Sequence, residues 1–140
     1  MNRALLLLLV VGCEPSRQNR AEDFARGLAD VHRWDPLRQA QGFYAYDELM
    51  RLGDEAIPAL LARLTDDTQT RIMDHAHIAV PVVGDVCFQM LLKLTGMRAE
   101  EFASDGVVVL REIENPIFAV RFDPGARLRV QKRFRKLVER

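Results

Sequence analysis

Hydrophobic and polar residues follow three different patterns along this chain. Residues 4–11 are apolar without interruption, residues 14–20 are polar, and the rest of the chain carries apolar residues mostly at the spacing of helix faces. A helix that packs on a protein surface needs only one apolar stripe, so the unbroken first run indicates a different role. The patterns divide the chain into three regions, 1–12, 13–20 and 21–140, of which the last is long enough for one compact domain.

The third region opens with a predicted helix. Phe24, Leu28 and Val31 recur at helical spacing, which predicts a helix that starts at Ala21. We expect it to end at residues 34–36, Trp-Asp-Pro, because the residue before a proline avoids helical backbone angles.

Two further helices are predicted on either side of Gly53. Residues 43–53 form the first, since glycine is common just past a helix end. Residues 54–65 form the second, with Asp54 as its cap and Pro58 in its first turn, where the missing amide has no helical partner. Its predicted buried stripe consists of Ile57, Leu60, Leu61 and Leu64.

Another helix is predicted after a turn at Asp66 and Asp67 and a long irregular segment over residues 68–81. It ends at residues 95–96, Thr-Gly. Its apolar stripe is the strongest in the chain and consists of Val83, Val86, Cys87, Met90, Leu91 and Leu94.

The last third of the chain has a different pattern. Residues 107–113 and 117–122 are rich in β-branched and aromatic residues and predict a β-hairpin around residues 114–116. A turn at residues 123–125 precedes a final helix over residues 128–139. Its predicted inward residues are Val130, Phe134, Leu137 and Val138. The fold class predicted from these patterns is mainly α, with helix pairs, a small C-terminal β-hairpin and a final helix.

The join between the two central helices resembles a known repeat. Residues 49–67 read Leu-Met-Arg-Leu-Gly-Asp-Glu-Ala-Ile-Pro-Ala-Leu-Leu-Ala-Arg-Leu-Thr-Asp-Asp, which is similar to the HEAT-like (PBS-lyase-type) repeat with its Leu-Gly-x-x-Ala-hydrophobic-Pro-x-Leu join. The resemblance implies HEAT-like antiparallel helix pairs, with a degenerate second unit over residues 83–96. Residues 68–81 depart from the repeat, which argues against a regular solenoid. The resemblance concerns the scaffold, so phycobilin-lyase activity is not carried over.

The first residues carry the features of a secretory signal peptide. Arg3 precedes the apolar run, which ends at Gly12 and Cys13. The run is far shorter than the ~20 residues that span a bilayer. Residues 10–13, Val-Val-Gly-Cys, resemble the lipobox of bacterial lipoproteins. This resemblance implies that Cys13 is acylated, for example with palmitate, and that residues 1–12 are removed.

The lipoprotein resemblance also implies a location. It places the protein in the bacterial cell envelope, anchored by lipid and facing the periplasm, and Glu14 after the cysteine favours the outer membrane over the inner one. Residues 13–20 would then be the acylated cysteine and a tether. The alternative is a hydrophobic N-terminal helix that packs on the domain, with Cys13 as a small buried residue. The signal is short, and a true start upstream of Met1 is the other alternative that the sequence leaves open.

Charge and cysteine content narrow the choice of partners. The chain has 20 basic and 20 acidic residues, and this balance argues against a nucleic-acid partner. Cys13 and Cys87 are its cysteines. An acylated Cys13 leaves Cys87 as a lone thiol, which we expect to be buried, whereas an unmodified Cys13 would allow a disulfide between the two.

One segment has side chains that could bind a metal. His75 and His77 are two residues apart, and Asp74 or Asp85 could add an oxygen ligand. They support the alternative function, a periplasmic metal-binding or hydrolytic domain. The competing interpretation is that the histidines are solvated and that Asp85 caps the helix that begins near it.

The sequence contains no nucleophile motif and no phosphate-binding glycine loop, so we expect neither an enzyme nor a cofactor. The favoured hypothesis is a lipid-anchored scaffold that binds another protein, with exposed aromatics such as Trp34, Tyr44 and Tyr46 as candidate anchors. A purely structural envelope role is the other non-catalytic hypothesis. The final helix adds a basic face, either solvated or set against anionic lipid headgroups, made of Arg127, Arg129, Lys132, Arg133, Arg135, Lys136 and Arg140.

Overall fold

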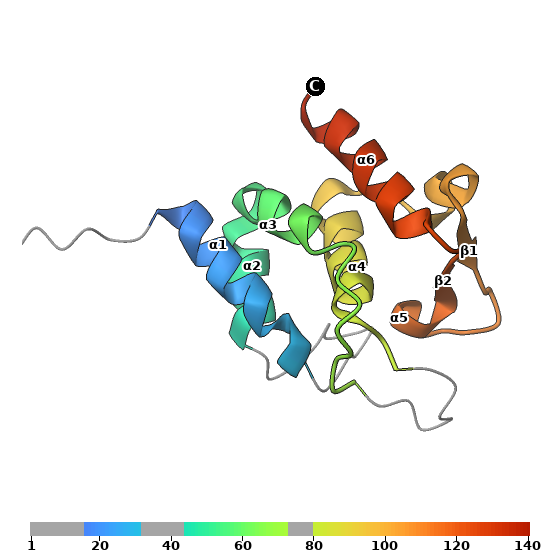
Figure 1. Ribbon diagram of the computed structural model, residues 1–140, viewed down its shortest axis with the longest axis horizontal. Helices are drawn as coiled ribbons and strands as arrows, with labels where there is room; N and C mark the ends of the chain where they lie inside the picture. The colour runs from blue at the N-terminus through green and yellow to red at the C-terminus, as the bar shows by residue number, and fades with distance from the viewer. Residues whose placement is uncertain (1–15, 32–43, 73–79) are drawn as a thin grey trace, which may run out of the picture.

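The computed structural model describes residues 16–31, 44–72 and 80–140 (Figure 1). In these ranges the chain is mainly helical, with one small antiparallel sheet and a final helix, which confirms the predicted fold class. Every helix in these ranges is too short or too polar to cross a membrane.

The N-terminal half is a group of short helices that pack on one another at one side of the molecule (Figure 1). Helix α1 contacts both α2 and α3, and α3 contacts α4. In chain order the elements are α1 (Arg17–Arg26), the 3-10 turn η1 (Gly27–Asp30), α2 (Tyr44–Leu52), the 3-10 turn η2 (Gly53–Ala56) and α3 (Ile57–Ala62).

Helix α1 begins at Arg17, and the predicted start at Ala21 was therefore wrong. The Ser16 hydroxyl accepts a hydrogen bond from the backbone N–H of Asn19 at 3.2 Å and so caps the helix. The first turn is polar and exposed, so it adds nothing to the apolar periodicity that predicts the start. The predicted tether over residues 13–20 is shortened accordingly.

The join between α2 and α3 follows the sequence prediction in most respects. Gly53 adopts φ +60°, the left-handed conformation that ends α2, and Pro58 lies in the first turn of α3. Asp54 makes no capping bond, so its predicted role was wrong: η2 lies between the two helices, and α3 starts only at Ile57. The predicted apolar stripe of α3 is buried.

The C-terminal half is built around helix α4, which lies in the centre of the molecule in Figure 1. Its predicted stripe is buried except for the half-buried Leu94, and Gly96 ends it with φ +70°. The elements of this half are α4 (Val83–Thr95), the 3-10 helix η3 (Ala99–Asp105), β1 (Val107–Val109), α5 (Pro116–Ala119), β2 (Val120–Phe122) and α6 (Ala126–Val138).

The two strands are antiparallel but shorter than predicted. Val107 lies opposite Phe122, and Val109 lies opposite Val120. The predicted second strand began at Ile117, but residues 116–119 form the helical turn α5. The Asn115 side chain accepts a hydrogen bond from the Ile117 N–H at 3.2 Å, and Pro116 occupies the first helical position, so capping there outweighs the β propensity.

A cluster of aromatic rings joins α4 to the elements around it. The ring of Phe88 lies edge-on to Phe102 at 5.6 Å, Phe122 at 5.0 Å and Phe134 at 6.2 Å between centroids. Edge-to-face pairs of this kind stabilise a core beyond the area that they bury. Phe88, Phe102 and Phe134 are fully buried, so α4, η3 and α6 share one hydrophobic core.

The last turn of α6 departs from the predicted pattern. Val130 and Phe134 are buried as predicted, but Leu137 and Val138 are 37% and 44% exposed. They continue the apolar side of the helix, whose final turn projects from the body of the molecule (Figure 1). Their predicted inward position was wrong, because no other element of the described ranges covers them fully.

Candidate functional site

The predicted metal-binding residues are not brought together in the described part of the structure. Asp74, His75 and His77 lie outside the described residues. Asp85 accepts a hydrogen bond from the Val82 N–H at 2.8 Å and one from Arg127 at 2.5 Å, so both of its oxygens have protein partners. The predicted capping role of Asp85 is confirmed, and the described ranges hold no group of three or more residues suited to a metal.

The Asp85–Arg127 pair belongs to a close junction between α3, α4 and α6. The Gly84 N–H donates to the Asp66 carbonyl at 2.9 Å, and the Arg127 guanidinium lies over the Phe122 ring at 4.2 Å. Arg63 binds the Asp66 carboxylate at 2.8 Å. Burial alone would raise the pKa of Asp66, but its hydrogen bonds with Thr68 and the charge of Arg63 lower that pKa overall.

Cys87 is a buried free thiol, which confirms the prediction for the lone cysteine. Burial raises the pKa of this thiol far above its ordinary value. A protonated, enclosed thiol does not act as a nucleophile or metal ligand. Cys13, the predicted acylation site, lies outside the described residues.

The candidate aromatic anchors have different environments. Tyr44 is 70% exposed and meets the edge of the Phe24 ring at 5.4 Å between centroids, so it is available to a partner. Tyr46 is buried, and burial followed by the charge of Asp47 raises its pKa to about 12. Tyr46 is thus a core residue and not an anchor. Trp34 lies outside the described residues.

The basic residues of α6 form two groups. Arg127 binds Asp85, Arg129 donates to the Asp105 carbonyl at 3.0 Å, and Arg133 binds the Asp105 carboxylate at 2.8 Å. All three hold α6 against α4 and η3. Arg127 and Arg133 are partly buried, so the prediction of a solvated or lipid-facing role was wrong for them, whereas Arg129 is exposed. The second group is exposed and consists of Lys132, Arg135, Lys136 and Arg140.

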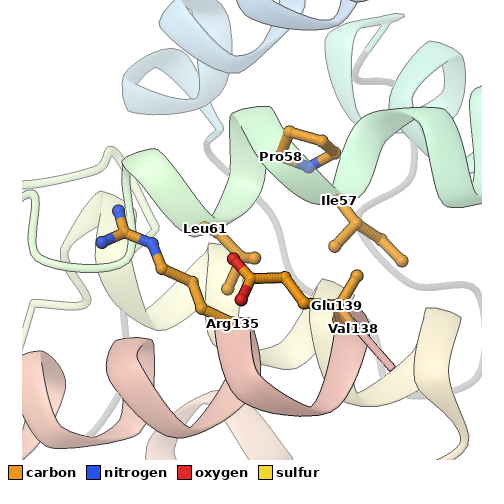
Figure 2. A pocket seen from close by; sticks show the side chains of 6 residues that line it. All are labelled: Ile57, Pro58, Leu61, Arg135, Val138 and Glu139. Atoms are coloured by element: carbon orange, nitrogen blue, oxygen red, sulfur yellow. The ribbon is translucent and has the colours of Figure 1, made fainter.

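A mainly apolar groove lies between α3 and the last turns of α6 (Figure 2). Ile57 and Leu61 of α3 point toward α6, where Val138 completes the apolar lining. Arg135 and Glu139 add charges to it. The volume of the groove is about 240 Å³.

A second groove of about 260 Å³ lies between α1 and α3. Its small apolar residues and its charged residues come from both helices: Gln18, Glu22, Ala25, Arg26, Pro58, Ala59, Ala62 and Arg63. Sequence reasoning missed both grooves, because a groove depends on how two helices pack and not on the periodicity of either one.

The chain was compared with known protein families, curated proteins and solved structures. No family matches it, and neither does any curated protein or solved structure.

Proposed function

We propose that this protein is a bacterial lipoprotein, anchored to the membrane through acylated Cys13, whose helical domain binds a protein partner without catalysis. The observation that carries the proposal is the sequence of residues 1–13, with one basic residue, an unbroken apolar run, a glycine and a cysteine. Each buried methylene of an acyl chain contributes ~0.8 kcal/mol, so several chains make release from the membrane negligible.

The position of the first helix sets the length of the tether. Ser16, the third residue after Cys13, already caps α1. The folded domain therefore begins closer to the proposed acylation site than the predicted tether over residues 13–20 implies.

The groove between α1 and α3 supports the partner-binding role. Charged and polar side chains such as Glu22 and Arg26 line it together with Pro58. Polar side chains of this kind can form hydrogen bonds and ion pairs with a partner across an interface. HEAT-like helix pairs, which the sequence of α2 and α3 resembles, use such surfaces between helices to bind other proteins.

Fractionation of cells tests the anchor. Wild type and Cys87→Ala, which keeps Cys13, should both be recovered with the membranes. Cys13→Ser should not be acylated and should lose the mature, membrane-bound form. Recovery of all three proteins in the same soluble fraction would refute the proposed anchor.

Crosslinking in intact cells tests the partner. A specific crosslinked species should form with wild type and disappear with Ala62→Arg, which places a large cation in the α1–α3 groove. Ala103→Arg is the matched control, because Ala62 and Ala103 are both exposed and only Ala62 lines the groove. A crosslinked product that still forms with both variants would contradict the assignment of the α1–α3 groove as the binding surface. So would the absence of any specific crosslinked product with wild type.

A further inference from the structure

The start of α1 and the end of α6 both lie beside the first turn of α3, on either side of Pro58. Pro58 lines the α1–α3 groove together with Gln18, and it lines the α3–α6 groove together with Val138. Arg17 also binds Glu55, just before α3, with 2.6 Å between guanidinium and carboxylate. The point where the chain enters the fold and the last turn of α6 therefore both flank the same end of α3.

The exposed cations of α6 gather toward this end. Lys132, Arg135, Lys136 and Arg140 are all exposed, and none of them has an ion-pair partner within residues 16–31, 44–72 and 80–140. Glu139 is the sole acidic residue of this stretch. These four exposed cations differ from Arg127, Arg129 and Arg133, which form hydrogen bonds with residues of α4 and η3.

Exposed apolar side chains accompany these cations. Leu137 and Val138 lie within the same turn and are 37% and 44% exposed. Basic residues beside exposed apolar ones are typical of segments that lie at the headgroup level of a membrane. We call this surface the α6 end; it consists of Lys132, Arg135, Lys136, Leu137, Val138 and Arg140.

The length of chain before α1 restricts how far the domain can stand from the membrane. Only two residues separate Cys13 from Ser16. At ~3.5 Å per residue, the start of α1 cannot be more than roughly 10 Å from an acylated Cys13. The side of the domain that carries the α6 end is thus held close to the bilayer.

We propose that the α6 end docks on the anionic headgroups of the membrane in which the protein is anchored. This inference rests on the proposed acylation of Cys13, which brings the surface and the lipid together. Phosphate-bearing lipids complement the unpaired cations in charge, and each cation near such a surface strengthens binding by roughly fivefold. The docking fixes the orientation of the domain relative to the membrane.

A thiol-labelling experiment on the acylated full-length chain tests the docking. Val138→Cys places a reporter thiol in the α6 end, and Val108→Cys is the matched control, since Val108 on β1 is 45% exposed. Cys87 is fully buried and does not interfere. Each protein is reconstituted in vesicles of phosphatidylcholine, with or without phosphatidylglycerol, and treated with an uncharged maleimide.

The thiol at position 138 should react roughly tenfold more slowly in the anionic vesicles than in the neutral ones, whereas the rate at position 108 should change little. Arg135→Gln with Lys136→Gln should abolish most of that protection. Lys93→Gln with Arg111→Gln, which removes the same charge from exposed sites elsewhere, should not.

Equal rates in both vesicles at position 138 would overturn the docking. Protection in native membranes but not in pure lipid would also overturn it, because a protein would then cover the surface. The state of Cys13 is measured by mass before labelling. An unmodified Cys13 in membrane material refutes the proposed anchor, whereas equal labelling of acylated protein refutes the docking alone.

Discussion

Replacing Gly84 by alanine tests the close approach of α3 to α4. Gly84 lies in the first turn of α4, and a Cβ atom there would lie 2.4 Å from the Leu64 carbonyl oxygen and 2.8 Å from Arg127 Nη1. The first of these atoms belongs to the backbone and cannot move alone. Helix propensity alone gives the opposite sign, since alanine is favoured over glycine by about 1 kcal/mol inside a helix.

The expected size follows from three contributions. Overpacking of a tight site costs about 1–3 kcal/mol. Any shift of α4 also lengthens the 2.9 Å bond from the Gly84 N–H to the Asp66 carbonyl, and a lost hydrogen bond costs about 1 kcal/mol. The gain in helix propensity offsets part of these two costs. Gly84→Ala should therefore lower the free energy of unfolding by about 2 kcal/mol.

Urea unfolding of wild type and variant, followed by circular dichroism, measures the difference. The midpoint should fall without a change in slope, which would show a loss of stability without a change in the surface exposed. Gly53→Ala is a useful comparison, because Gly53 has φ +60° and a methyl group there would meet no atom within 4 Å. Gly53→Ala should therefore lower the free energy of unfolding by about 1 kcal/mol, through backbone strain alone. A Gly84→Ala protein as stable as wild type would refute the close approach.

Three other predictions concern the core and the buried charges. Phe134→Ala should cost about 3–5 kcal/mol in urea unfolding because its ring is fully buried, whereas Leu128→Ala, at a half-exposed site on the same helix, should cost less than about 1 kcal/mol. Cys87 should react with a thiol reagent only upon unfolding, and fast labelling of folded protein would contradict its burial. The lowered pKa of Asp66 stabilises the fold above the ordinary carboxyl pKa of 3.8, and this stabilisation is lost as pH falls through the lowered value. Asp66→Asn should therefore be less stable than wild type at neutral pH, with a difference that shrinks in acid; a constant difference would exclude this linkage.

Local signals explain which parts of the fold the sequence predicts. The apolar stripe of α3, the stop at Gly53 and the end of α4 at Gly96 depend on residues close together in the chain. The start of α1 escapes prediction because its first turn is polar and its cap is a single serine. The β propensity of residues 117–119 predicts a strand where α5 forms. The prediction fails because propensity takes no account of the capping hydrogen bond that Asn115 accepts from the Ile117 N–H.

Contacts between distant residues could not be predicted in this way. Arg127 binds Asp85, and Arg133 binds Asp105, across gaps of 42 and 28 residues. Nothing in the sequence of α6 separates these arginines from the exposed cations, so the sequence predicts a single basic face. The candidate anchor at Cys13 is the reverse case, because its signal lies wholly in thirteen consecutive residues.

The most direct test of the account is the mass of the amino-terminal peptide from membrane-fraction protein. The account predicts a peptide that starts at Cys13 and carries covalent lipid, and that is absent from the Cys13→Ser variant. A peptide that still contains residues 1–12, or one that starts at an unmodified Cys13, would contradict the membrane anchor.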